Sequence, residues 1–134
     1  MLASNPMIEA SHIAPEHLRP IRRSEYEQMV ASGFFDDERI ELLDGVLVTM
    51  SPQNAIHAEV VGRLARWLLP ALLGRAHVRV QSPLALSGDS EPEPDLAVVP
   101  VGDYSQGHPE TAWIVVEVSD SSLNKDSVVK ARLC

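Results

Sequence analysis

The sequence predicts one small domain of the α/β or α+β class, in which helices cover a β-sheet. The chain has 134 residues, enough for a single domain with a modest core. Short apolar runs rich in β-branched residues, typical of strands, alternate with longer segments of helical periodicity. An Asp44-Gly45 pair between two apolar runs is typical of a tight hairpin turn. Together these patterns favour a sheet that buries its apolar side chains against helices.

The composition narrows the function classes. Apolar residues make up 45% and charged residues 22% of the chain, as in ordinary globular proteins. The net charge of −8 argues against a globally basic nucleic-acid binder, although it is compatible with a local basic groove. The single cysteine, Cys134, leaves no internal disulfide and no cysteine-based zinc site. Because no stretch has the length of a transmembrane span and the N-terminus lacks a signal sequence, we expect a cytoplasmic protein without membrane contact.

The N-terminal part of the chain predicts a lead-in, a short helix and a hairpin. Residues 1–20 lack periodicity, so we expect a loosely ordered lead-in to one domain at 21–134. The helix is expected at 23–31. The hairpin strands are expected at 40–43 and 46–50, on either side of the Asp-Gly pair.

The following segment predicts a long helix. Ser51-Pro52 puts a proline where the first helical turn tolerates it, and Pro70 marks an end or a kink. The core-facing stripe of this helix is expected at Val61, Leu64, Leu68 and Leu72. Beyond it, the patterns predict three strands and a last short helix, at 78–86, 95–99, 112–118 and 122–133.

Two of these strands carry a carboxylate where a purely structural strand would avoid one. Asp95 follows Pro94 at the start of an apolar strand, and Glu117 lies between Val116 and Val118. An ionised carboxylate in a buried strand costs several kcal/mol unless it is paired or bound to a cation. Two such groups on neighbouring strands can hold one hard metal ion, which indicates metal-assisted hydrolysis. The structural alternatives are a turn residue for Asp95 and a solvated or Arg-paired strand end for Glu117.

Three further residues are candidates for the same site. Lys130 is spaced i, i+4 from Asp126, and a lysine near two carboxylates can orient water or stabilise charge on a phosphoryl oxygen. Most lysines are simply solvated. His57 lies on the apolar stripe of the long helix, where a buried, hydrogen-bonded histidine is the favoured interpretation. Glu41 is either a third carboxylate or an exposed strand position, and the second is slightly favoured.

Short segments of the chain, in order, resemble a known family. They are IELLDGVLV at 40–48, MSPQNAIH at 50–57, VGRL at 61–64, PDLAVV at 94–99, VVEVS at 115–119 and DSVVKARL at 126–133. This chain resembles the Uma-two family of restriction-endonuclease-like proteins, in the PD-(D/E)XK nuclease superfamily. The resemblance implies a mixed central sheet flanked by helices. Proteins of this kind continue past the last segment, so the chain looks truncated at its C-terminus.

The resemblance also implies roles for the candidate residues. Pro94-Asp95 matches the "PD" of the superfamily, and Glu117 matches its second acid. Ser119 stands where the superfamily usually has lysine, while Lys130 matches the lysine that the Uma-two pattern supplies later in the chain. Asp95, Glu117 and Lys130 would then be catalytic, with Asp95 and Glu117 as metal ligands and Glu41 and His57 as accessory residues.

The sequence therefore favours a Mg²⁺- or Mn²⁺-dependent endonuclease that hydrolyses DNA phosphodiester bonds. The candidates for phosphate contacts are Arg63, Arg66, Arg79 and Lys125. A catalytically inactive binding or regulatory module with a nuclease fold is the alternative, and a product that does not fold stably is a third. RNA as the substrate and a homodimer as the active form are left open by the sequence.

Overall fold

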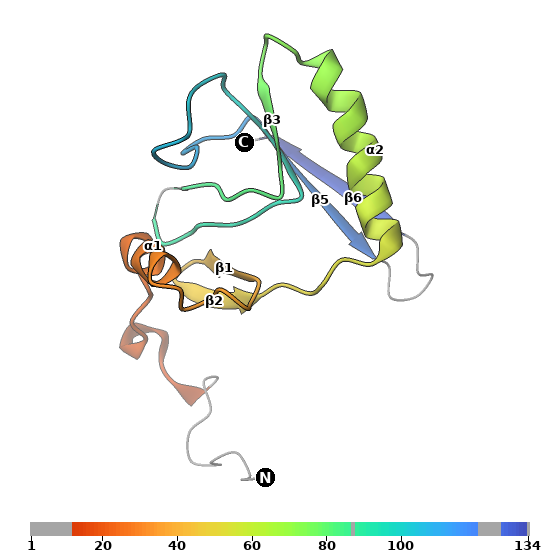
Figure 1. The fold of residues 1–134 in the computed structure, drawn as a ribbon. Coiled ribbons are helices and arrows are strands. Elements are labelled where there is room, and N and C mark those ends of the chain that lie inside the picture. The colour runs from red at the N-terminus through yellow and green to blue at the C-terminus, as the bar shows by residue number, and fades with distance from the viewer. Residues whose placement is uncertain (1–11, 87, 121–126, 134) are drawn as a thin grey trace.

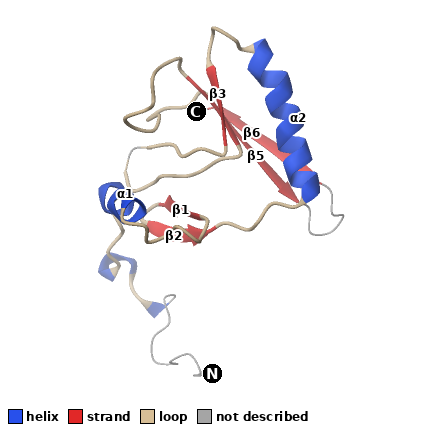
Figure 2. Cartoon of the chain, viewed as in Figure 1, coloured by secondary structure: helices blue, strands red, loops and turns tan. Residues whose placement is uncertain are grey.

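The fold is described by a computed structural model, over residues 12–86, 88–120 and 127–133. This part of the chain contains helices α1 and α2, the β1–β2 hairpin and an antiparallel sheet in the order β3-β4-β5-β6 (Figures 1 and 2). The predicted combination of helices with a sheet is confirmed. Part of the predicted lead-in, residues 1–11, lies outside the described residues, and a 3₁₀ turn at Pro15–His17 precedes α1. No helix in these ranges is long and apolar enough to cross a membrane.

Helix α1 spans Arg23–Ala31, as predicted. Its first turn is capped by Glu25, whose Oε1 accepts a hydrogen bond from the Arg22 backbone N–H at 3.0 Å. Gly33, with a positive φ of 84°, follows the last turn, as glycine often does at helix C-termini. Tyr26 is the buried residue of α1, and its hydroxyl donates to the Ile40 carbonyl at 3.0 Å, which joins the helix to the hairpin.

The predicted hairpin is confirmed, with β1 at Ile40–Leu43 and β2 at Val46–Thr49. Asp44 and Gly45 have φ of 48° and 79°, which is the signature of a type I′ turn. A Cβ at Gly45 would lie 2.3 Å from the Pro20 Cβ, so this position accepts only glycine. The hairpin also exchanges two backbone hydrogen bonds between Leu42 and Glu91, which attach it to the loop before β4.

Helix α2 spans Ala55–Ala71, so its predicted start at Ser51 is wrong. The side chain of Asn54 accepts a hydrogen bond from the His57 backbone N–H at 2.8 Å and caps the helix there. Because Asn54 provides the cap, residues 51–54 stay non-helical. Pro70 lies in the last turn, close to the predicted end.

The main sheet is formed by β3 (His77–Val80), β4 (Leu96–Val99), β5 (Ile114–Asp120) and β6 (Ser127–Leu133). Helix α2 packs along it (Figure 1), and the core between them combines Val61 of α2 with Leu96, Val116 and Val118. A second buried cluster contains Leu84, Ala97, Val99 and Ala112. Strand β3 ends earlier than predicted, because Gln81 has a positive φ of 48° and turns the chain.

The predicted helix at 122–133 is wrong, because Ser127–Leu133 forms strand β6, antiparallel to β5. The i, i+4 spacing of Asp126 and Lys130 suggested a helix, but the β-branched pair Val128-Val129 suits a strand beside β5. Residues 121–126, which include Lys125 and Asp126, lie outside the described residues.

Candidate active site

The candidate catalytic positions form a row across the sheet. Glu117 of β5 is the register partner of Lys130 of β6. Ala97 is paired with Val115, so the same register, continued by two residues, brings Asp95 opposite Glu117. Directly opposite positions share one face of a sheet, with Cβ atoms about 5 Å apart. The strand pairing thus brings Asp95, Glu117 and Lys130 to neighbouring positions.

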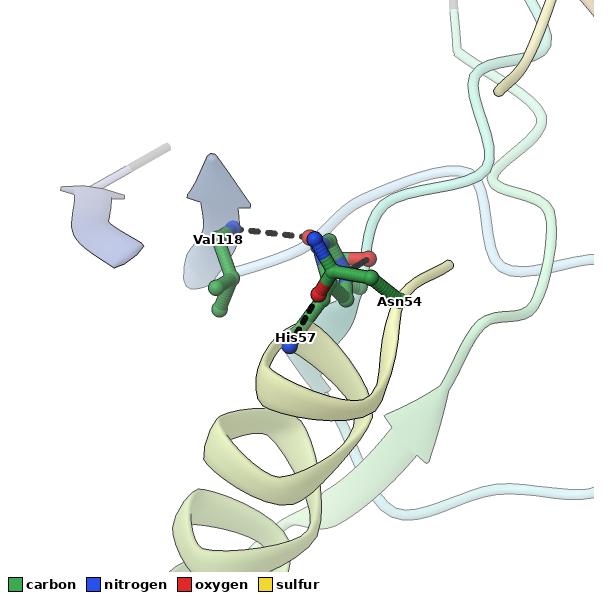
Figure 3. A network of polar contacts seen from close by, with 4 residues as sticks. Asn54, His57 and Val118 are labelled. Atoms are coloured by element: carbon green, nitrogen blue, oxygen red, sulfur yellow. Dashed lines mark hydrogen bonds and ion pairs between the residues drawn. The ribbon is translucent and has the colours of Figure 1, made fainter. Parts of the chain in front are cut away.

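Asp95 is held in place by two hydrogen-bond donors. The Val118 backbone N–H donates to Asp95 Oδ2 at 2.7 Å, and His57 Nε2 lies 3.0 Å from Asp95 Oδ1 (Figure 3). The residue is only 8% exposed, so these contacts replace most of the water that an ionised carboxylate would bind. Both carboxylate oxygens therefore have a fixed direction before any ligand arrives.

His57 reaches Asp95 because α2 begins at this end of the sheet (Figure 3). Asn54 fixes the first turn of α2, and His57 follows three residues later with its ring half-buried. The favoured sequence interpretation, a hydrogen-bonded histidine, agrees with this contact. The partner of His57 is Asp95, the candidate metal ligand. The apolar pattern of the helix alone could not have indicated this contact.

An open cleft of about 370 Å³ surrounds these groups. Glu41, Asp95, Glu117 and His57 all line it, together with Val118 and Ser119 at the end of β5. Glu41 Oε2 also accepts a hydrogen bond from the Glu93 backbone N–H at 3.1 Å. The hairpin, α2 and the sheet therefore each contribute a polar side chain to one cavity.

The charges in the cleft repel one another. The pKa of Glu117 is raised to about 7, chiefly by removal of solvent by the surrounding atoms, although the residue is exposed by surface area. The charges of Asp95 and Glu41 and contact with the Asp95 carboxyl contribute to this increase, while His57 opposes it. A site in which carboxylates oppose each other's ionisation favours binding of a cation.

The donors suit a hard divalent cation that keeps several water ligands. Mg²⁺ typically binds one or two carboxylates and retains water for the rest of its octahedron. Asp95 and Glu117 supply two carboxylates, and the neighbouring backbone carbonyl of Val118 is a further oxygen. Within residues 12–86, 88–120 and 127–133, no group of three or more His, Cys, Asp or Glu side chains is arranged to hold a metal. Two carboxylates of this kind, completed by water, would suit a hydrated Mg²⁺ or Mn²⁺ ion.

The arginines proposed from the sequence as phosphate contacts lie elsewhere. Arg63 and Arg66 project from α2 with exposed side chains, at 2.9 and 3.6 Å from Glu59 Oε1. The guanidinium of Arg79 stacks 5.6 Å from the centre of the Tyr104 ring, and its Nε is buried. None of these three is among the residues that line the cleft.

Other residues of the cleft were given no role by the sequence analysis. Arg39, Gln53, Asn54 and Ser119 line the cleft. Arg39 could have been found, because it precedes Glu41 by two residues and alternation along a strand puts both on one side. The contribution of Gln53 and Asn54 depends on how the segment before α2 crosses the sheet, which no local pattern encodes.

Comparison with known proteins assigns the chain to a family. No curated protein and no solved structure matches the chain. The sequence model of the Uma2 family, described as "Putative restriction endonuclease", matches residues 23–134. This match includes α1, the hairpin, α2 and the whole sheet with its cleft. The chain therefore belongs to the Uma2 family of restriction-endonuclease-like proteins.

Proposed function

We propose that the protein is a metal-dependent endonuclease that hydrolyses DNA phosphodiester bonds in this cleft. The observation that carries the proposal is the convergence of Asp95 and Glu117 on one cavity, where the charge of Asp95 helps to raise the pKa of Glu117. A structural role would leave such a repulsion uncompensated. Family membership supports a nuclease function.

Asp95 and Glu117 would hold the ion, assisted by the backbone carbonyl of Val118. Bound Mg²⁺ or Mn²⁺ supplies Lewis-acid chemistry, which polarises the scissile phosphate and lowers the pKa of an attacking water. His57 and the Val118 N–H keep the Asp95 oxygens in position through the bonds at 3.0 and 2.7 Å. His57 is therefore a positioning residue in this proposal, and Glu41 adds negative charge to the cation site.

Lys130 would act on the water or on the phosphate. A lysine ammonium beside the site can orient the nucleophile and stabilise the charge that develops on the phosphoryl oxygens. Its register position opposite Glu117 supports this role. Strand β6 would then supply the ammonium that the superfamily usually takes from the position of Ser119.

The test is cleavage of supercoiled plasmid in Mg²⁺ or Mn²⁺. We expect D95N and E117Q to lose at least about 100-fold in nicking rate, because each removes a metal-ligand charge while keeping its shape. K130M should also be strongly impaired. The matched control is E59Q, which removes a carboxylate from the outer side of α2. Equal nicking by wild type, D95N and E117Q would assign the activity to a contaminant or another site.

An inactive binding or regulatory module with the nuclease fold is the second candidate. It is favoured by the lack of a three-ligand cluster among the side chains that the structure describes. In that case Asp95 and Glu117 would be remnants of a nuclease site. This candidate predicts plasmid that stays supercoiled at every metal concentration and a melting temperature that does not respond to Mn²⁺.

A further inference from the structure

We propose that Arg39 binds a backbone phosphate of the DNA next to the phosphate that is cut. This inference rests on the proposed function and names the residue that holds the substrate at the mouth of the cleft. It concerns a position that neither the sequence motifs nor the family match single out. The argument depends on the position of Arg39, on the charges around it and on the location of the other arginines.

The backbone of Arg39 is fixed by the hairpin. The Met50 backbone N–H donates to the Arg39 carbonyl at 2.8 Å, which continues the β1–β2 ladder one pair beyond Ile40 and Thr49. Arg39 and Glu41 are separated by two residues, so both face the same side of the hairpin. The exposed Arg39 and the half-buried Glu41 both line the cleft that contains Asp95 and Glu117.

The charges of the residues that line the cleft indicate a role for Arg39. The described lining residues include the acids Glu41, Asp95 and Glu117, and Arg39 is the one arginine or lysine among them. A DNA strand carries a phosphate at each nucleotide, so an ion at the carboxylates can neutralise only the phosphate that it contacts. The neighbouring phosphate needs another cation, and a guanidinium suits it because it can donate two parallel hydrogen bonds.

The alternative cations are less suitably placed. Arg63 and Arg66 lie beside Glu59 on α2, and Arg79 is covered by Tyr104. Arg39, by contrast, lines the cleft itself, and it also lines the neighbouring cavity that contains Glu93.

The experiment measures DNA binding without cleavage. Anisotropy of a labelled duplex is recorded with EDTA present, over a range of KCl concentrations, for wild type, R39Q, R39K and R63Q. Each neutralised phosphate contributes about 0.9 to the slope of log K against log[salt]. We expect R39Q to reduce the magnitude of the slope by about 0.9, and R39K and R63Q to keep the wild-type slope.

The possible outcomes separate the two proposals. Salt-dependent binding by wild type with an unchanged slope in R39Q overturns the role of Arg39 and leaves the nuclease proposal intact. An equal loss of slope in R39Q and R63Q also overturns it, since any arginine would then serve. Absence of DNA binding by wild type overturns the DNA substrate and this inference with it. Melting curves of the variants, which should superimpose on wild type, separate lost contacts from misfolding.

Discussion

At the scale of single residues, the protein also buries an acidic side chain outside the cleft. Glu91 is 5% exposed, and its Oε1 finds no hydrogen-bond donor among the described residues. It lines a separate cavity of about 280 Å³ beside Tyr26 and Phe35. Burial raises the pKa of Glu91 to about 8, helped by contact with Glu27 and by its charge. With its pKa raised to about 8, the Glu91 carboxyl is mostly protonated at neutral pH.

This buried acid predicts a pH dependence of stability. Unfolded Glu91 titrates near its ordinary value of 4.5 and folded Glu91 near 8, so between these values the folded state holds a proton that the unfolded state has lost. The free energy of unfolding should fall as pH rises through this window. Arg23 and Glu93 also face Glu91, with opposite effects on its pKa.

Urea unfolding of E91Q at pH 5 and pH 8 measures the effect. The amide needs no proton, so E91Q should gain stability relative to wild type between these values, on the order of 2 kcal/mol after allowance for solvent screening. E110Q, at an exposed position, is the matched control and should follow wild type. Parallel pH profiles for E91Q and wild type would show that Glu91 ionises normally.

At the scale of elements, the start of α2 connects stability to the site. Asn54 caps the helix, and the turn that it holds brings His57 to Asp95. N54A should lower the free energy of unfolding by about 1 kcal/mol, the usual cost of a lost N-cap. It should also slow plasmid nicking by about 10-fold or more, the usual effect when support for a metal ligand is lost.

N54S is the control, because serine also accepts the N-cap hydrogen bond. Chemical denaturation and plasmid nicking of both variants would test the connection. If N54A loses stability and keeps full nicking activity, the cap supports the fold alone, and the His57–Asp95 contact does not depend on it.

Some secondary-structure elements could be predicted from the sequence and others could not. The hairpin was predictable because Asp44-Gly45 encodes its turn within two residues, and α1 ended at Ala31 as expected. Strand β6 was missed because a helical spacing competes there with β-branched residues, and pairing with the preceding strand, β5, decides the outcome. The start of α2 was missed because Ser51 and Asn54 are both plausible caps, and only Asn54 has the right geometry.

The residues of the candidate site likewise divide into those that the sequence predicted and those that it did not. Asp95 and Glu117 were found because an acid in an apolar strand is conspicuous, and their convergence follows from the strand pairing. Arg39 was overlooked although its two-residue spacing from Glu41 pointed to it, whereas the His57–Asp95 bond was not found because it depends on how α2 approaches the sheet. The arginines chosen from the sequence alone proved to lie away from the cleft.

At the scale of the whole molecule, the cleft is built from three separate parts of the fold. The hairpin contributes Glu41, the first turn of α2 contributes His57, and the sheet contributes Asp95 and Glu117. A cation bound there would hold these acids together and would stabilise the folded state, because the unfolded chain lacks the site. Metal binding should therefore be visible as stability, independently of any cleavage.

We predict that Mn²⁺ raises the melting temperature of the wild-type protein by several degrees at saturation. A ligand at about 100 times its Kd stabilises by roughly 2.7 kcal/mol, and D95N should lose most of this gain.

E117Q should behave differently in the absence of metal. Because the pKa of Glu117 is raised to about 7, ionisation of this acid costs stability increasingly as pH rises from 4.5 to 7. At pH 8 the metal-free E117Q protein should therefore melt above metal-free wild type, yet respond little to Mn²⁺. Thermal melts with EDTA and with Mn²⁺ measure both effects, and a full Mn²⁺ response in D95N and E117Q would place the cation outside this cleft.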